Sequence, residues 1–226
     1  MIKHIHRFET NADFQAAYNG PQYIEPWLSY TEGEGVGYNK HTVEYNAVDL
    51  GLPSGTKWCD RNVGASSPED LGGYYAWGET SQKSLCDWTT YVYGSGPNNL
   101  TKYNSTDGKY ILDAVDDAAS VNIGPQWKTP TIAQITELTA NTTSTSTTLN
   151  GVEGRRFTSN INGNSIFIPF AGVRFGRNID YSDCCCMWSA QLGNTDTAEY
   201  LDFDGSAIGI YGFSRCFGLS VRGVRQ

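Results

Sequence analysis

The chain has 226 residues, a formal net charge of −8 and 39% hydrophobic residues, which fits one good-sized domain with a small appendage. Its acidity argues against nucleic acid as a partner, because a phosphate backbone binds basic surfaces. No apolar run approaches the roughly 18–20 residues of a membrane span, so we expect no membrane insertion. The N-terminal stretch MIKHIHRFETNADF lacks the apolar core of a signal peptide, which predicts synthesis in a cytoplasm without Sec export.

Residues 1–45 differ in character from the rest of the chain. The stretch RFETNADFQAAYNG predicts a helix that begins at Thr10 or Asn11 and ends at Gly20. The following EPWLSYTEGEGVGYNK predicts two strands joined by a Gly-rich turn. Because so short a segment cannot hold a core alone, we expect it to attach the main domain to a partner or to form a homo-oligomer.

From residue 46 the pattern predicts short strands and many loops. The stretch AVDLGLPSGTKWCDRNVG indicates two strands around a Pro-Ser-Gly turn, and a short helical turn is expected at 67–71. Residues 94–110 are rich in Gly, Asn, Ser and Thr, which is typical of a loop. The stretch DAVDDAASVN predicts a short helix with Asp116 and Asp117 as a charge pair at its N-terminus.

The clearest helix is expected in TPTIAQITELTAN. Thr131 and Gln134 have the spacing of a capping box, in which each side chain bonds the other residue's backbone N–H. Ile132, Ile135 and Leu138 then fall on one face of the helix.

The rest of the chain predicts strands. Asn150-Gly151 is a typical hairpin turn, and the β-branched residues at 142–148 favour a strand before it. A further strand is expected in NINGNSIFIPFAG and the last in LSVRGVRQ. Residues 199–213 alternate with a period of two, which predicts a strand pair with one apolar face in a core.

Three adjacent cysteines in 184-CCCMWSA-190 raise four possibilities: a metal site, a redox site, a disulfide or chance. A disulfide framework is disfavoured, because adjacent cysteines point in diverging directions and rarely pair. No CxxC pair is present to indicate a zinc site. We therefore expect no metal and no cofactor.

The sequence contains no assembled active site. The three histidines, His4, His6 and His41, all lie in the N-terminal segment, far from the C-terminal cysteines in sequence. Asp202 and Asp204 share one strand face, but nothing next to them in sequence indicates the raised pKa that acid–base catalysis needs. These observations favour a binding or structural protein over an enzyme.

Residues 46–226 resemble a known group. The phrases that carry the resemblance are VDLGLPSGTKWCDRNVGASSPEDLGGYYAWGET, LTKYNSTDGKYILDAVDDAASVNIGPQWKTPT, GNSIFIPFAGVR, MWSAQ and GLSVRGVR. They are similar to the Bacteroidetes (Fibrobacter) major paralogous domain, of the C-type lectin-like, formylglycine-generating-enzyme-like superfamily. The resemblance implies an α+β, C-type lectin-like fold of short antiparallel strands, two or so helices and long loops. Residues 1–45 resemble N-terminal segments of gut Bacteroidales phage proteins.

This group includes the variable proteins of diversity-generating retroelements, in which template adenines are mutated and the product replaces the 3′ end of the gene. The resemblance implies a variable region at about 173–222, from AGVR to SVRGVR. A randomised AAC codon encodes 15 residue types but never Lys, Glu, Gln, Met or Trp. Met187 and Trp188 therefore belong to the expected constant scaffold, whereas Cys184–Cys186 fit three neighbouring variable codons. Replacing these three cysteines with serine should then leave the fold intact.

The resemblance assigns two sets of residues. The residues expected to bind ligand are Phe175, Arg177, Asp180, Tyr181, Ser182, Asp183, Cys184, Cys185, Cys186, Ala190, Tyr200, Asp202, Asp204, Ala207, Gly209, Tyr211, Gly212, Phe213, Ser214, Cys216 and Phe217. The residues expected to form the scaffold beneath them are Trp188, Leu201, Phe203, Ile208 and Ile210.

The implied function is that of a hypervariable receptor-binding protein without enzymatic activity. Its ligand would be a bacterial surface protein or a glycan, and residues 1–45 would join it to a structural protein of a phage tail in the virion. An invariant carbohydrate-binding or surface structural module of the same family is the alternative, and an oxidase using Cys184–Cys186 or Cys216 is the third. Calcium-dependent sugar binding is not supported, because Glu25-Pro26 is followed by Trp27 instead of Asn.

Overall fold

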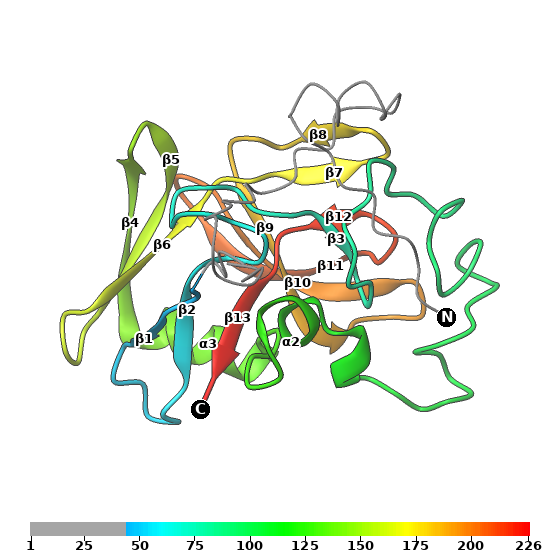
Figure 1. Ribbon diagram of the computed structural model, residues 1–226, viewed down its shortest axis with the longest axis horizontal. Helices are drawn as coiled ribbons and strands as arrows, with labels where there is room; N and C mark the ends of the chain where they lie inside the picture. Colours follow the sequence, from blue (N-terminus) through cyan, green and yellow to red (C-terminus); the bar gives the residue numbers. More distant parts are fainter. Residues whose placement is uncertain (1–43) are drawn as a thin grey trace, which may run out of the picture. The chain divides into compact units, whose positions relative to one another are not determined.

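A computed structural model describes residues 44–226. The helix and strands expected within residues 1–43, and the three histidines, lie outside the described residues. In the described part, all paired strands run antiparallel and form four small sheets (Figure 1), so the domain is α+β with mostly β structure.

The four sheets draw on distant parts of the chain. The first has the order β1 (Ala47–Asp49), β2 (Lys57–Asn62), β13 (Arg222–Arg225). The second has the order β11 (Ile208–Ser214), β10 (Thr197–Phe203), β9 (Cys185–Leu192). The third has the order β3 (Tyr75–Ala76), β12 (Gly218–Leu219), β7 (Val173–Phe175), β8 (Asn178–Asp180). The fourth has the order β4 (Thr142–Leu149), β5 (Val152–Ser159), β6 (Ser165–Pro169).

Helix α3 (Ile132–Asn141) confirms the capping-box prediction. The Gln134 N–H donates to Thr131 Oγ1 over 3.3 Å, and the Thr131 N–H donates to Gln134 Oε1 over 2.9 Å. Ile135 and Leu138 are fully buried, as the helical spacing predicts. Neither this helix nor α2 (Ala118–Ile123), the two α-helices of the described residues, is long and apolar enough to cross a membrane.

The hairpin prediction is also confirmed. β4 and β5 are joined by Asn150 and Gly151, whose φ angles of 49° and 86° are those of a type I′ turn. Asparagine and glycine tolerate this left-handed backbone better than other residues, which fixes the register of the whole strand pair.

Two local expectations need correction. Residues 67–71 form only a single turn, in which the Asp70 N–H donates to the Ser67 carbonyl over 3.2 Å, and no helix follows it. Asp117 caps α2, after the 3-10 turn η1 (Ala114–Asp116), by accepting from the Ala119 N–H. Asp116 instead accepts from the Tyr93 hydroxyl over 2.7 Å, so the two aspartates are not a helix-terminal charge pair.

The sheet β9–β10–β11 separates two hydrophobic cores. One core includes Trp188 and Tyr200 together with aromatic residues of β3 and the loop that follows it. The other includes Met187, Leu201 and Phe203 together with α3 and the fourth sheet. Since side chains alternate along a strand, this one sheet contributes side chains to both cores.

A buried arginine holds the C-terminal strand in place. Arg222 is fully buried and donates to Asn62 Oδ1 at 2.9 Å and to the carbonyls of Cys59 and Phe167 at 3.0 Å each. Burial lowers the pKa of Arg222 to about 10, which still leaves the guanidinium charged at neutral pH. Its donors therefore join β2, β6 and β13 through polar contacts inside the domain.

Arg222→Met should lower the free energy of unfolding by about 3 kcal/mol or more, because three buried acceptors lose their donors. The matched control is Arg177→Met, at an exposed position, which should change stability by less than about 0.5 kcal/mol. Urea unfolding of the full chain measures both. Equal effects of the two variants would contradict this role for Arg222.

Candidate ligand-binding surface

Five aromatic side chains form a continuous row, here called the aromatic row, with the buried Tyr200 within it: Phe175, Phe217, Phe213, Tyr200 and Tyr211. The rings of Phe175 and Phe217 are stacked with centroids 4.1 Å apart, and Phe217 lies 5.4 Å from Phe213. Tyr200 lies 5.6 Å from Phe213 and 6.3 Å from Tyr211. Phe175 is 48% exposed and Tyr211 54% exposed, so both ends of the row reach solvent.

Strand register explains why the row has a rigid base. Tyr200 of β10 lies opposite Tyr211 of β11 on one side and opposite Trp188 of β9 on the other. Trp188 is buried, and its indole N–H donates to the Tyr75 carbonyl over 2.8 Å. The half-exposed aromatic side chains are thus supported by a fully packed indole.

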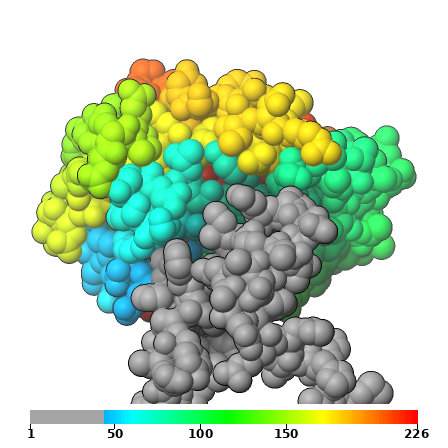
Figure 2. Space-filling view, turned by 45° about the horizontal axis from the view of Figure 1, so that its top comes forward, coloured from blue at the N-terminus to red at the C-terminus, as the bar shows by residue number. Residues whose placement is uncertain are grey.

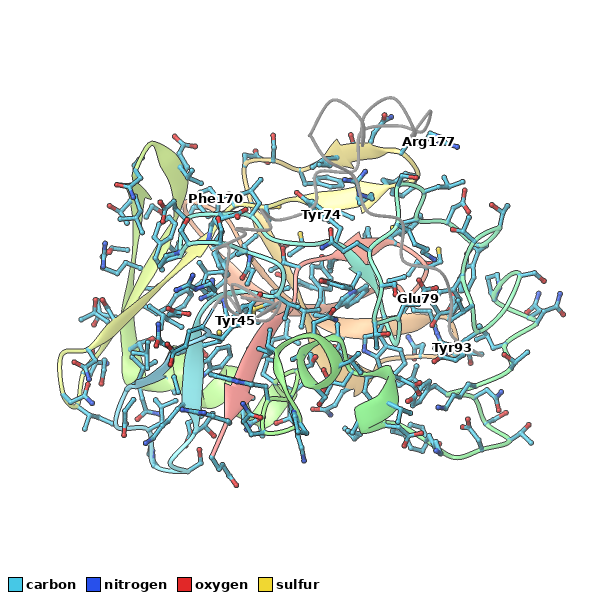
Figure 3. The ribbon with its side chains drawn as sticks, viewed as in Figure 1. Tyr45, Tyr74, Glu79, Tyr93, Phe170 and Arg177 are labelled. Atoms are coloured by element: carbon cyan, nitrogen blue, oxygen red, sulfur yellow. The ribbon has the colours of Figure 1, made fainter. Side chains whose placement is uncertain are left out.

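The β7–β8 hairpin and the loop after it extend this surface. Figure 3 shows Arg177 at the end of the hairpin and Tyr74 below β7. A Cβ atom at Gly172, whose φ is +65°, would lie 2.4 Å from the Asp180 carbonyl oxygen, so only glycine allows the loop to pack this closely. Residues 177–183 are all exposed.

The hairpin loop lies next to the β10–β11 strand pair. Figure 2 shows both segments along the top of the described domain. Cys184, which ends the loop, approaches Cys186 and Asp202 so closely that their ligand atoms all lie within 4.8 Å of one another. The aromatic row, the loop and this thiol–carboxylate group are therefore parts of one surface.

The three adjacent cysteines have three different environments. Cys184 is half-buried, and its Sγ lies 3.6 Å from the Sγ of Cys186. Cys186 is 4% exposed, and its Sγ lies 3.7 Å from Asp202 Oδ1. Cys185 points into the other core and is fully buried, which raises the pKa of its thiol. All six cysteines are free, as the spacing argument predicts.

Asp202, on β10, and Asp204, directly after it, have different environments. Asp204 accepts from the N–H groups of Ser206 and Ala207 at 2.6 and 2.7 Å, which stabilises the β10–β11 turn and lowers its pKa. Burial raises the pKa of Asp202, whose nearest polar contact is the Cys186 thiol. The raised pKa of Asp202 is a feature that the residues next to it in sequence did not indicate.

Most residues of the expected binding set lie at this surface. Those exposed to solvent are Phe175, Arg177, Asp180, Tyr181, Ser182, Asp183, Ala207, Tyr211 and Gly212. Those half-buried are Cys184, Asp202, Asp204, Gly209, Phe213, Ser214 and Phe217. Whether they bind a ligand stays a prediction.

Five residues of the expected binding set are buried. The prediction that their side chains are displayed at the surface was therefore wrong. They are Cys185, Cys186, Ala190, Tyr200 and Cys216, all at most 9% exposed. Cys185 points to the opposite core, and β3 with its following loop packs over the part of the sheet that holds Tyr200. Burial also raises the pKa of Cys216 to about 11, so this thiol is protonated at neutral pH.

Of the five residues expected to form the scaffold, three are buried as predicted. Trp188, Leu201 and Phe203 are at most 1% exposed. Ile208 is 37% exposed and Ile210 half-buried, because both lie on β11, the edge strand of its sheet. The alternation of apolar residues gives the correct face of β11 for both isoleucines. It does not reveal that this edge strand leaves them partly exposed to solvent.

Sequence reasoning omitted Asn178 and Ile179, which are exposed on β8. Ile179 is 44% exposed. Both residue types belong to those that a randomised AAC codon encodes, so the codon argument was sufficient to include them.

Comparison of the chain with protein families, with curated proteins and with solved structures returned no match.

Cys185→Ser should lower the free energy of unfolding by about 1–3 kcal/mol, because a hydroxyl would be buried in an apolar core. Cys184→Ser, at the half-buried neighbouring position, should change it by less than about 0.5 kcal/mol. Thermal or urea unfolding of both variants tests this difference. The expectation that all three cysteines tolerate serine would be restored if Cys185→Ser were as stable as Cys184→Ser.

Proposed function

We propose that the chain is a non-enzymatic, hypervariable ligand-binding protein, diversified by a retroelement and built on a C-type lectin-like scaffold. The observation that carries this proposal is the division of residue types at the surface. The exposed members of the aromatic row and of the hairpin loop are all types that a mutated AAC codon can encode. Met187 and Trp188, which it cannot encode, lie in the same segment and are buried.

The chemistry of the surface suits recognition of a partner. Phenylalanine and tyrosine side chains offer large, rigid contact areas, and serine and glycine adapt to a partner, as in antibody loops. Arg177, Asp180 and Asp183 add charges of both signs around the aromatic row. A C-type lectin-like scaffold accords with the coarse fold, in which small antiparallel sheets and long loops carry the surface.

The proposed setting is a phage tail. Residues 1–45 would attach the domain to a virion protein, and the ligand would be a bacterial surface protein or a glycan. Display of several copies would raise the overall avidity far above a weak single-site affinity. No enzymatic activity and no cofactor form part of this proposal.

A second candidate is an invariant carbohydrate-binding module of the same family. The stacked pair Phe175 and Phe217, with Phe175 exposed, favours it, since exposed aromatic faces pack against the apolar faces of sugar rings. The two candidates differ in what sister genes contain. Diversification predicts adenine-linked substitutions at the surface positions, and an invariant module predicts none.

The nucleotide sequence of the 3′ end of the gene and its flank tests the proposal. We expect a nearby reverse-transcriptase gene and an imperfect repeat of the region encoding residues 173–222, with mismatches only at template adenines. Codons for Met187, Trp188, Leu201 and Phe203 should be identical in both copies. A locus without such a repeat or without a reverse-transcriptase gene would contradict the proposal.

A further inference from the structure

We propose that Cys184, Cys186 and Asp202 form a binding site for a borderline-soft divalent cation of the Zn²⁺ type. This goes beyond the proposed ligand-binding function and does not depend on it. The sequence predicted no metal, because the three residues do not follow any familiar ligand spacing. Strand register, which the local sequence does not specify, brings them together.

The bend before β9 and the strand register bring the three side chains together. Cys184 lies in the bend directly before β9, and its side chain packs against the same core as Cys186 of β9, while Cys185 between them points to the opposite core. Asp202 of β10 is the register partner of Cys186 of β9. Two thiols and one carboxylate therefore meet at the edge of the aromatic row.

The spacing matches tetrahedral zinc. With Zn–S bonds of about 2.3 Å and a Zn–O bond of about 2.1 Å, two sulfurs would be about 3.8 Å apart, and a sulfur and an oxygen about 3.6 Å apart. The Cys184 and Cys186 sulfurs are 3.6 Å apart, and Cys186 Sγ lies 3.7 Å from Asp202 Oδ1. The Cys184 sulfur and an Asp202 carboxylate oxygen lie within 4.8 Å of each other, so side-chain rotation would bring all three atoms into bonding distance of one ion.

The local charge also favours a cation. Asp202 is not part of any ion pair within residues 44–226. Thiolate sulfur selects zinc and cadmium over the hard ions magnesium and calcium.

Binding would proceed by simple exchange. One Zn²⁺ ion forms two bonds to sulfur and one to the carboxylate, and the two thiol protons pass to the buffer. A fourth position would remain for water or for a donor atom of a ligand, as in zinc sites with three protein ligands. The ion would then stand beside Tyr200, two residues from Asp202 along β10.

Titration of the full chain tests the site. The protein is kept in a non-thiol reductant and titrated with Zn²⁺ against a chromophoric chelator, and then with Cd²⁺, whose bond to thiolate gives an ultraviolet charge-transfer band. We expect one ion per chain, a cadmium–thiolate band and a raised midpoint of thermal unfolding. Cys184→Ser and Asp202→Asn should each weaken Zn²⁺ binding by at least about tenfold, because loss of a residue that only hydrogen-bonds to a metal ligand already costs about 10–100-fold.

Matched controls separate this site from others. Cys216→Ala removes a buried thiol elsewhere, and Asp183→Asn removes an exposed carboxylate beside Cys184 that is not part of the group. Both should bind Zn²⁺ like the parent chain. Three results would each overturn the proposal. They are the absence of stoichiometric binding, binding that survives both ligand variants, and a disulfide between Cys184 and Cys186 that persists in the reductant.

Discussion

The alternation of side chains along β9 is the constraint on which the rest of the surface depends. Trp188 and Cys186 face the core that supports the aromatic row, while Cys185 and Met187 face the core against α3. A shift of register by one residue would exchange the two sets and place Met187 under the candidate site. Because each face packs against a different core, such a shift is disfavoured on both sides at once.

Arg215 and Arg222 hold the segments around this sheet. Arg215 is fully buried, donates to the Tyr91 hydroxyl at 2.7 Å and to the Tyr103 carbonyl at 2.8 Å, and packs over the ring of Trp77. It thereby ties the long loop after β3 to the connection between β11 and β12. Buried hydrogen bonds as well as apolar packing therefore hold the scaffold together, and both support the exposed loops.

The sequence predicted the elements whose cause is local. The capping box of α3 and the Asn150-Gly151 turn depend on a few adjacent residues, and both are present. It did not predict the burial of Tyr200 or of the two arginines, because burial depends on contacts with segments far away along the chain. Most hydrogen-bond partners of the two arginines are 55 to 163 residues away. The meeting of Cys184 with Asp202 was missed for another reason: a period-two pattern gives the face of a strand but not the neighbour across the sheet.

The central claim is that a rigid scaffold carries a freely variable surface, and saturation mutagenesis of residues 173–222 in the full chain, selected for protease resistance, tests it most directly. Charged substitutions at Met187, Trp188, Leu201 and Phe203 should be lost, since burial of an unpaired charge is strongly destabilising. Most substitutions at Phe175, Arg177, Tyr181 and Tyr211 should be retained. Equal sensitivity of the exposed and the buried positions would contradict the claim.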